Sequence, residues 1–300
     1  MDEYAGNSLT RGSGHGHRLR VARILLISSF TASSHVGSVV SAFVLRRMGI
    51  NVSVLPTTLF GRHPGWGAPG GDVVPTDKLT GMWEAVSAQA DRQAQPFDAV
   101  MTGYMGEIGH VTLAADIIDT LRPKTVLVDP VMGDGSRTEG GLYIGQDRAE
   151  AICDQLIPRA HIATPNLWEW RYMTGNLNEA PDTPPRPLVG INETLITSVT
   201  EQDKIGAILF EGGQTHRIMH ERYHGVPNGG GDTLAAAYLG QRLRGDDPRA
   251  ALAHSVSAVF AIMGAAQDID AGELPVIRAQ RFLDADGGAP ELTVETTHDA

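Results

Sequence analysis

The chain has 300 residues, of which 42% are hydrophobic and 20% are charged, so it is long enough to bury a large core. Its formal net charge is −11, and its Lys and Arg residues are scattered, which argues against nucleic acid as the main partner. One cysteine, Cys153, is typical of a reducing compartment, and no apolar run approaches the ~20 residues of a membrane helix, so we expect a cytoplasmic protein that binds no membrane.

The first half of the chain alternates apolar runs with segments of helical period. Residues 1–20 are glycine-rich and lack the apolar stretch of a secretory signal, so we expect a flexible N-terminal extension. The pattern then predicts strands and helices in alternation, with strands at 21–30, 51–60, 98–103 and 125–131 and helices at 35–49, 77–94, 109–121 and 146–157. Residues 61–71 are rich in glycine and proline and are predicted to be a loop. This order indicates an α/β fold of three layers, with helices on both faces of a mainly parallel sheet.

The second half completes the same core. The pattern predicts a short helix, a strand, a hairpin and two helices, at 167–175, 193–199, 207–225, 233–244 and 248–265. Residues 176–190 are too rich in proline for a regular element. Nothing separates two domains, so we expect one domain over 21–283, and a frayed acidic tail over 284–300.

Residues 220–224 spell HExxH, the pattern of zinc proteases, which requires a helix. At helical spacing His220 and His224 would lie about 6 Å apart on one face. Here the pattern alternates polar and apolar residues between Gly213 and Gly225, as a strand does, and a strand would separate the two histidines by roughly 13 Å. We therefore expect a hairpin strand instead of a zinc site.

Three consecutive glycines, Gly229, Gly230 and Gly231, stand directly before Asp232 and the helix predicted from Thr233. Glycines let the backbone turn its N–H groups toward one point, and the helix adds its positive N-terminal end. The sequence therefore predicts a phosphate site here. Asp232 is either an ordinary helix N-cap or a catalytic base, and the residues alone leave both roles open.

Seven further motifs occur along the chain in this order: ILLISSF, HVG, LFGRH, MTGYMG, LVDPVMGD, ATPNLWEW and LITSV. Together with GVPNGGGDTLAAAYLG they cover about residues 21–268, and as an ordered set they resemble the pyridoxal kinases, a family of ribokinase-like fold. The resemblance implies that ATP phosphorylates the 5′-hydroxymethyl group of pyridoxal, with pyridoxine and pyridoxamine as further acceptors. It implies that Asp232 is the base, that the three glycines form the anion hole, and that the chain is a homodimer.

The resemblance also assigns the remaining site residues. The acceptor ring is expected to lie among Ser29, Val36, Phe60, His63 and Tyr104. ATP is expected to lie against Tyr143, Asn166, Thr197 and Ser198, under a mobile glycine-rich lid at 133–143. Asp129 and Glu169 are expected to hold Mg²⁺ directly or through water, with K⁺ near Thr164. Taken singly, several of these residues also suit plainer roles, such as core packing for Val36 and Phe60.

The chain departs from the family pattern at a few positions. Gly230 stands where many relatives have Thr or Ala, Pro64 stands where many have Thr, and Phe30 replaces a common His. One alternative is a hydroxymethylpyrimidine kinase with the same fold and base. Another is a non-catalytic vitamer-binding protein, which would be expected to lose Asp232 or the pair of Asp129 and Glu169, and all three are present.

Overall fold

The protein is described by a computed structural model that covers residues 21–135, 141–178 and 183–298. Its strands are β1 (Arg23–Thr31), β2 (Asn51–Phe60), β3 (Gly71–Val73), β4 (Ala99–Thr102), β5 (Thr125–Val128), β6 (Ile162–Ala163), β7 (Glu193–Glu201), β8 (Lys204–Glu211), β9 (Gln214–Glu221) and β10 (Glu295–His298). They form one ten-stranded sheet in the order β10-β9-β8-β7-β6-β5-β4-β1-β2-β3. The six central strands, in the order β7-β6-β5-β4-β1-β2, are parallel to one another. At one edge β3 pairs antiparallel with β2, and at the other β8, β9 and β10 follow β7 in antiparallel pairs.

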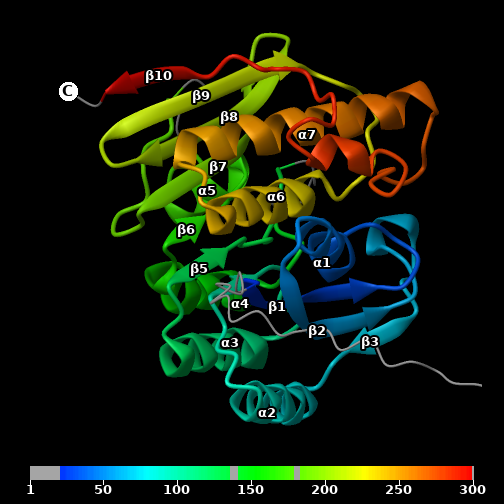
Figure 1. The fold of residues 1–300 in the computed structure, drawn as a ribbon, viewed down its shortest axis with the longest axis vertical. Coiled ribbons are helices and arrows are strands. Elements are labelled where there is room, and N and C mark those ends of the chain that lie inside the picture. The colour runs from blue at the N-terminus through cyan, green and yellow to red at the C-terminus, as the bar shows by residue number, and fades with distance from the viewer. Residues whose placement is uncertain (1–20, 136–140, 179–182, 299–300) are drawn as a thin grey trace, which may run out of the picture.

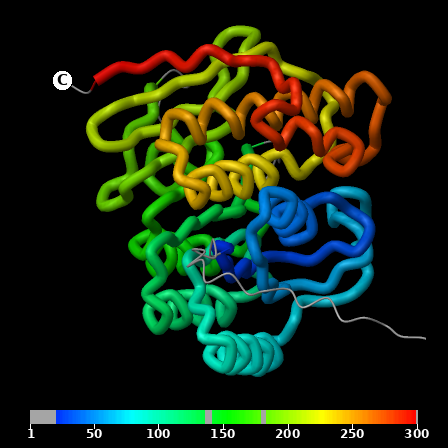
Figure 2. The backbone as a smooth tube through the Cα atoms, viewed as in Figure 1, coloured from blue at the N-terminus to red at the C-terminus, as the bar shows by residue number. Residues whose placement is uncertain are grey.

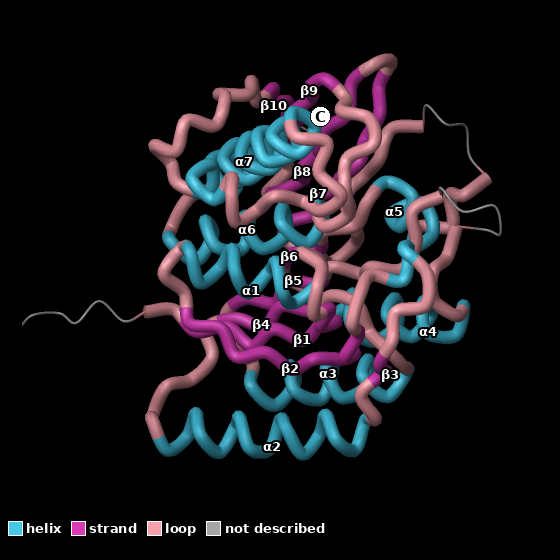
Figure 3. The backbone as a smooth tube through the Cα atoms, turned by 90° about the vertical axis from the view of Figure 1, so that its right-hand side faces the viewer, coloured by secondary structure: helices cyan, strands magenta, loops and turns pink. Residues whose placement is uncertain are grey.

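Helices cover both faces of this sheet (Figure 1). They are α1 (Gly37–Arg47), α2 (Thr76–Arg92), α3 (Ile108–Leu121), α4 (Gln146–Ala151), α5 (Leu167–Met173), α6 (Gly230–Arg244) and α7 (Pro248–Asp268). One core contains α1, α6 and α7, and the opposite face of the sheet packs against α2, α3, α4 and α5. Figure 3 shows α2 and α3 across the sheet from α1. The predicted three-layer α/β fold with a mainly parallel sheet is confirmed.

Alternating side chains of each central strand supply the two cores. On β1, Ile24 and Leu26 contact the core of α1, α6 and α7, whereas Leu25 and Ile27 contact the core of α2, α3 and α4. All four side chains are at most 1% exposed. Full burial of such a side chain contributes about 1.5–3 kcal/mol. A strand buried on both faces has a continuous apolar sequence, which is why this strand could be predicted.

Three local predictions are wrong. Gly71, predicted as the last residue of a loop, begins β3, because Gly71–Val73 pair with the end of β2. Residues 295–298, predicted as part of a frayed tail, form β10 and pair with β9. Helix α6 begins at Gly230 instead of Thr233. The glycine-rich sequences of β3 and of the α6 start are poor formers of those elements, and in all three cases contacts with other parts of the chain decide the outcome.

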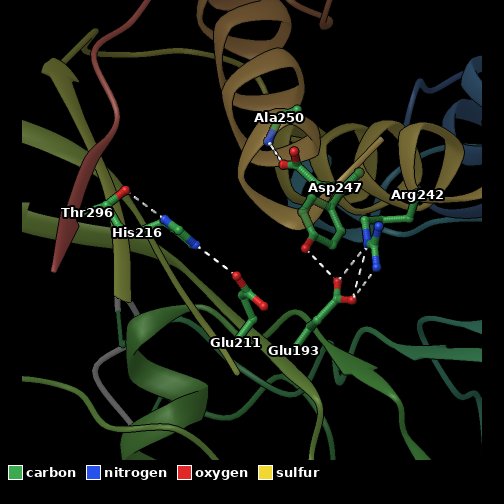
Figure 4. Close-up of polar contacts among 8 residues, drawn as sticks. Glu193, Glu211, His216, Arg242, Asp247, Ala250 and Thr296 are labelled. Atoms are coloured by element: carbon green, nitrogen blue, oxygen red, sulfur yellow. Dashed lines mark hydrogen bonds and ion pairs between the residues drawn. The ribbon is translucent and has the colours of Figure 1, made fainter. Parts of the chain in front are cut away.

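The tail strand is held by side chains as well as by backbone pairing. His216 on β9 is 1% exposed, and its ring lies between two side chains (Figure 4). Its Nε2 atom is 3.1 Å from Glu211 Oε1, and its Nδ1 atom is 2.9 Å from Thr296 Oγ1 on β10. The C-terminal segment therefore runs back along β9, as the red end of the chain does in Figure 2.

Among the described residues one helix, α7, is long and apolar enough to cross a membrane by length and composition alone. Half of its most apolar window is buried. Leu252 and Ile262 are fully buried in the core that α7 shares with α1 and α6. The apolar composition of α7 is therefore accounted for by packing inside this protein.

A buried ion pair joins α6 to the start of β7 (Figure 4). Tyr238 donates a 2.6 Å hydrogen bond to Glu193 Oε2, and Arg242 Nη2 lies 2.8 Å from Glu193 Oε1. Tyr238 is fully buried and Glu193 is 8% exposed, so Arg242 balances a carboxylate that has little contact with water. Burial, and then the charge of Glu193, raises the pKa of Tyr238, so this phenol stays protonated and acts as a donor.

Replacing Arg242 by Met is expected to lower the free energy of unfolding by about 3 kcal/mol, because it leaves the carboxylate of Glu193 buried without a cation. Urea denaturation at pH 7 measures this change. Arg244→Met removes an exposed arginine from the same helix and is expected to cost less than about 0.5 kcal/mol. Equal losses in the two variants would contradict the role given to Arg242.

Candidate active site

The predicted site residues gather at one edge of the sheet, beyond the carboxyl ends of its parallel strands. The residues near or just after these strand ends are Ser29, Phe60, Tyr104, Asp129, Thr164 and Asn166. Thr197 and Ser198 lie within β7, just beyond its pairing with β6. Open α/β sheets bind their ligands at this edge. Three more predicted residues lie at helix starts on this edge. Val36 directly precedes α1, and Glu169 and Asp232 lie in the first turns of α5 and α6.

Gly229, Gly230 and Gly231 form the turn into α6. Gly229 is the N-cap and has a φ of +105°, in the left-handed region that favours glycine. A Cβ atom on Gly229 would lie 2.3 Å from the carbonyl oxygen of His35, so this turn packs tightly against the residues that precede α1. The first N–H groups of a helix have no acceptor within it. Here these N–H groups and the positive end of α6 make a site suited to phosphate.

Asp232 lies in the first turn of α6, two residues beyond the helix start, so it is not the N-cap. The backbone N–H of Gly37, the first residue of α1, donates a hydrogen bond to its carboxylate. Removal from water raises the pKa of Asp232 above its usual range, and the hydrogen bond from Gly37 opposes that rise. A raised pKa makes the carboxylate a stronger proton acceptor, which is the property that a general base needs.

Asp129 and Glu169 form a buried acidic pair, at 8% and 3% exposure. Burial, and then the charges of Glu169 and Asp232, holds the pKa of Asp129 well above its usual range, while the hydroxyl of Thr164 lowers it. Burial also raises the pKa of Glu169 to about 7. Buried carboxylates that repel one another favour a bound cation, and oxygen donors of this kind are those that Mg²⁺ prefers.

Both oxygens of Glu169 accept backbone hydrogen bonds. Met132 donates to Oε1 at 2.7 Å and Asn166 donates to Oε2 at 2.9 Å. The side chain of Asn166 in turn accepts from the N–H of Glu169, which completes a capping box at the start of α5. Val131 has a φ of +42°, which is rare for a β-branched residue, and this turn directs the next N–H groups to the carboxylate. Glu169 is therefore rigidly placed, and its remaining lone pairs face any metal or metal-bound water.

Three residues predicted to contact the nucleotide, Asn166, Thr197 and Ser198, meet where β7 passes beyond the end of β6. Thr197 donates a 2.9 Å hydrogen bond to the carbonyl of Pro165 and pairs with Asn166 in an isolated bridge. The register between β7 and β8 shifts within residues 196–199, and Ser198 has a φ of +56°. Such a bulge changes the direction of side chains beside an active site, and here it leaves Ser198 exposed at the sheet edge.

The predicted lid lies partly outside the described residues, since 136–140 are not described. At its described ends, added Cβ atoms on Gly133, Gly135 and Gly141 would come within 2.6 Å of the Trp168 ring. Because these residues have no Cβ atom, the backbone at both described ends of the predicted lid can pack directly against the indole ring of Trp168. Tyr143, at the end of the segment, is half-buried, and burial followed by the charge of Asp134 raises its pKa.

On the acceptor side, Val36 and His63 line a small pocket that opens to solvent and has a cavity volume of about 10 Å³. The other lining residues are Ser34, Trp66, Pro227, Asn228, Glu273 and Leu274. His63 Nδ1 accepts a 3.1 Å hydrogen bond from Gly65 N–H, and the Asn228 amide lies 3.5 Å from the same atom. Because Nδ1 accepts, a neutral His63 carries its proton on Nε2.

Several residues of this region were not predicted. Gly37 and Asn228 belong to the motifs HVG and GVPN, so the motifs pointed to these segments but did not indicate what the two residues do. Trp168 supports the lid glycines and could have been found only from the three glycines that precede it. Glu273 had no local signal at all, because its contacts lie with residues near the start of the chain.

The hairpin strand that was predicted forms, and the HExxH segment overlaps its end. Residues 214–221 make up β9, so His220 and Glu221 are the last two strand residues and His224 follows in a loop. The His220 ring packs 4.5 Å from the ring of Phe260 on α7. This histidine therefore contributes to packing.

A family model described as phosphomethylpyrimidine kinase matches residues 78–277. Curated relatives include a pyridoxal kinase PdxY of Leifsonia xyli, 28% identical over 277 residues, which cover 87% of this chain and 95% of that protein. Another is a pyridoxal kinase PdxY of Corynebacterium diphtheriae, 29% identical over 275 residues, at 87% and 95% coverage.

Solved structures share the fold. The pyridoxal kinase of Entamoeba histolytica has a TM-score of 0.80 at 22% identity and covers 93% of this chain and 100% of its own. A putative phosphomethylpyrimidine kinase of Bacteroides thetaiotaomicron, crystallised with pyridoxal, has a TM-score of 0.77 at 20% identity, with 92% and 100% coverage. These likenesses confirm the ribokinase-like fold predicted from the motifs.

Proposed function

The chain belongs to the phosphomethylpyrimidine kinase family, and on this premise we propose that it transfers the γ-phosphate of ATP to the 5′-hydroxymethyl group of pyridoxal. One observation carries the proposal: the Asp232 carboxylate lies directly after the glycine turn and accepts a hydrogen bond from Gly37, beside the acceptor wall at Val36. This arrangement supports a base that acts between the phosphate site and the acceptor wall. The relatives named pyridoxal kinase, which match over most of this chain, support pyridoxal as the acceptor.

In this mechanism Asp232 accepts the proton of the hydroxymethyl group as its oxygen bonds to the γ-phosphorus. The bond from the γ-phosphorus to the bridging oxygen breaks, and ADP leaves with the electron pair. The N–H groups at Gly229, Gly230 and Gly231 stabilise the negative charge on the transferred phosphoryl group. Tyr143, at the described end of the predicted lid, covers ATP and excludes water, which would otherwise compete as acceptor.

The acceptor ring lies between elements that come together only in the fold. Val36 and Phe60 supply apolar walls, Ser29 contacts the polar edge of the ring, and His63 and Tyr104 flank it. The proton on His63 Nε2 gives this side a hydrogen-bond donor. On the nucleotide side, Asn166, Thr197 and Ser198 contact ATP, the last two through their hydroxyls.

The acidic pair would hold Mg²⁺, with Asp129 contacting it and Glu169 acting through its remaining lone pairs, and K⁺ would lie near Thr164. Bound Mg²⁺ neutralises phosphate charge during transfer. No three His, Cys, Asp or Glu side chains of the described residues converge into a metal cage. Such a sparse set of carboxylates suits an ion that takes its other ligands from phosphates and water.

Magnesium binding is expected to weaken as the pH falls, because Mg²⁺ requires ionised carboxylates and protons compete with it. With a pKa of about 7 for Glu169, apparent affinity should fall about tenfold between pH 8 and pH 6. Calorimetric titration of Mg²⁺ at the two pH values measures this. Asp129→Asn should weaken binding at both, whereas Asp203→Asn, an exposed turn residue, should change neither. An affinity that does not vary with pH would contradict the assignment.

A coupled assay tests the proposal with pyridoxal, pyridoxine, pyridoxamine and hydroxymethylpyrimidine as acceptors. We expect turnover with pyridoxal to exceed that with hydroxymethylpyrimidine. Because the family is described as phosphomethylpyrimidine kinase, hydroxymethylpyrimidine is the alternative acceptor. Faster turnover with hydroxymethylpyrimidine than with pyridoxal would contradict our proposal. Binding of pyridoxal without any turnover would indicate a vitamer-binding protein. We also propose a homodimer that acts in the cytoplasm, which sedimentation and cell fractionation test.

A further inference from the structure

The residues that lead from β1 into α1 contact the acceptor loop, the anion turn and Asp232, and we call residues 32–37 the α1 entry segment. Ala32 N–H donates to the carbonyl of Phe60 at 2.8 Å, and Ser33 donates to the carbonyl of Gly61 through both its N–H and its hydroxyl. The hydroxyl of Ser34 accepts from His63 N–H at 3.3 Å. The entry segment therefore fixes the loop that carries the acceptor residues.

The second half of the entry segment contacts the phosphate side. The carbonyl oxygen of His35 would lie only 2.3 Å from a Cβ atom added to Gly229, so the two backbones are in close contact. Val36 lines the acceptor cavity, and the N–H of Gly37 donates to Asp232. Three consecutive residues thus touch the anion turn, the acceptor cavity and the base, and a shift of the segment would move all three together.

A distant glutamate holds this segment in place. Glu273, in the loop after α7, accepts a 2.9 Å hydrogen bond from the backbone N–H of His35. The His35 ring adds a second contact, a 2.8 Å hydrogen bond from Nδ1 to the carbonyl of Leu274. Because a carbonyl oxygen only accepts, Nδ1 carries the proton.

We propose that Glu273 is a positioning residue, which orients Asp232 and the Gly229 turn toward the acceptor by holding His35. This inference rests on the proposed kinase function. Glu273 is half-buried, so its hydrogen bond competes with water less than an exposed bond would. A displacement of about 1 Å at the reacting groups can cost about 10²-fold in rate, so one such bond can matter strongly for turnover.

The test compares Glu273→Ala with Glu273→Gln, whose side-chain carbonyl can still accept from His35 N–H. For Glu273→Ala we expect kcat to fall about 10- to 100-fold, while KM for ATP and the melting temperature stay close to those of the unchanged protein. Glu273→Gln should keep kcat within about threefold, because the hydrogen bond survives. Glu291→Ala, an exposed glutamate in the C-terminal segment, is the matched control and should have no effect.

Hydrogen exchange gives a readout that does not depend on turnover. Amides of residues 32–37 and 226–231 should exchange faster in Glu273→Ala than in the unchanged protein or in Glu273→Gln. Unchanged exchange at 226–231, a kcat within twofold of normal in Glu273→Ala, or equal loss in both variants would each overturn the proposal. An unchanged protein that phosphorylates no acceptor would refute the proposed function, and the exchange experiment would still decide the role of Glu273.

Discussion

Replacing Asp232 by Asn is expected to lower kcat by about 10²- to 10⁴-fold, the usual effect of removing a general base. This corresponds to about 3 to 5 kcal/mol of transition-state stabilisation. Asn has nearly the same shape, and its carbonyl can still accept the hydrogen bond from Gly37, so the fold and both binding sites should persist. Steady-state kinetics give kcat, and calorimetry with pyridoxal and a non-hydrolysable ATP analogue should give affinities within a few-fold of normal.

The pH dependence sharpens this test. The base must be ionised to accept a proton, so kcat/KM of the unchanged protein should fall as the pH drops through the raised pKa of Asp232. The small residual activity of Asp232→Asn should lack that acidic limb. Asp203→Asn, on the exposed turn between β7 and β8, serves as the control and should behave normally. Near-normal turnover in Asp232→Asn would remove the mechanism.

Replacing Gly229 by Ala is expected to lower kcat/KM by at least about 10²-fold. A side chain at a φ of +105° is strained, and its Cβ atom would collide with the carbonyl oxygen of His35 at 2.3 Å. Because the backbone fixes the position of the Cβ atom and its partner is a backbone oxygen, the collision cannot be relieved by a side-chain rotation. The anion turn or the segment before α1 must move, and either shift misplaces the phosphate relative to Asp232.

The neighbouring glycines provide a graded control. A Cβ atom on Gly231 would have no neighbour within 4 Å, so Gly231→Ala should keep kcat/KM within a few-fold. A Cβ atom on Gly230 would lie 2.3 Å from Met263 Cε, the far end of a flexible side chain, so Gly230→Ala should have an intermediate effect. Kinetics on the three variants test this order. Equal effects at Gly229 and Gly231 would contradict it.

The structure places the predicted residues at one edge of the sheet where motif and strand position agree. Asp129 directly follows β5, Thr197 lies on β7 just beyond the pairing of that strand with β6, and Asp232 follows three glycines. The charge effect of Glu169 and Asp232 on the pKa of Asp129 indicates that these three carboxylates lie near one another. Their roles remain proposals until the variants are measured.

Prediction failed where a contact joins segments that share no local pattern. Glu295–His298 form β10 because β9 offers an unpaired edge and His216 offers a partner for Thr296. Likewise α6 starts at Gly230, although glycine is a weak helix former, because Gly229 is fixed against His35.

The sequence by itself determined the layered α/β architecture, since alternating apolar runs of strand and helical period can be buried in few other ways. It also determined the glycine turn and its aspartate, because only glycine accepts such a backbone. The tertiary structure alone decided how tightly the carboxylates are buried, which N–H group meets Asp232, and that Glu273 holds His35. Those features depend on atoms brought together from opposite ends of the chain, and no local pattern of residues encodes such a meeting.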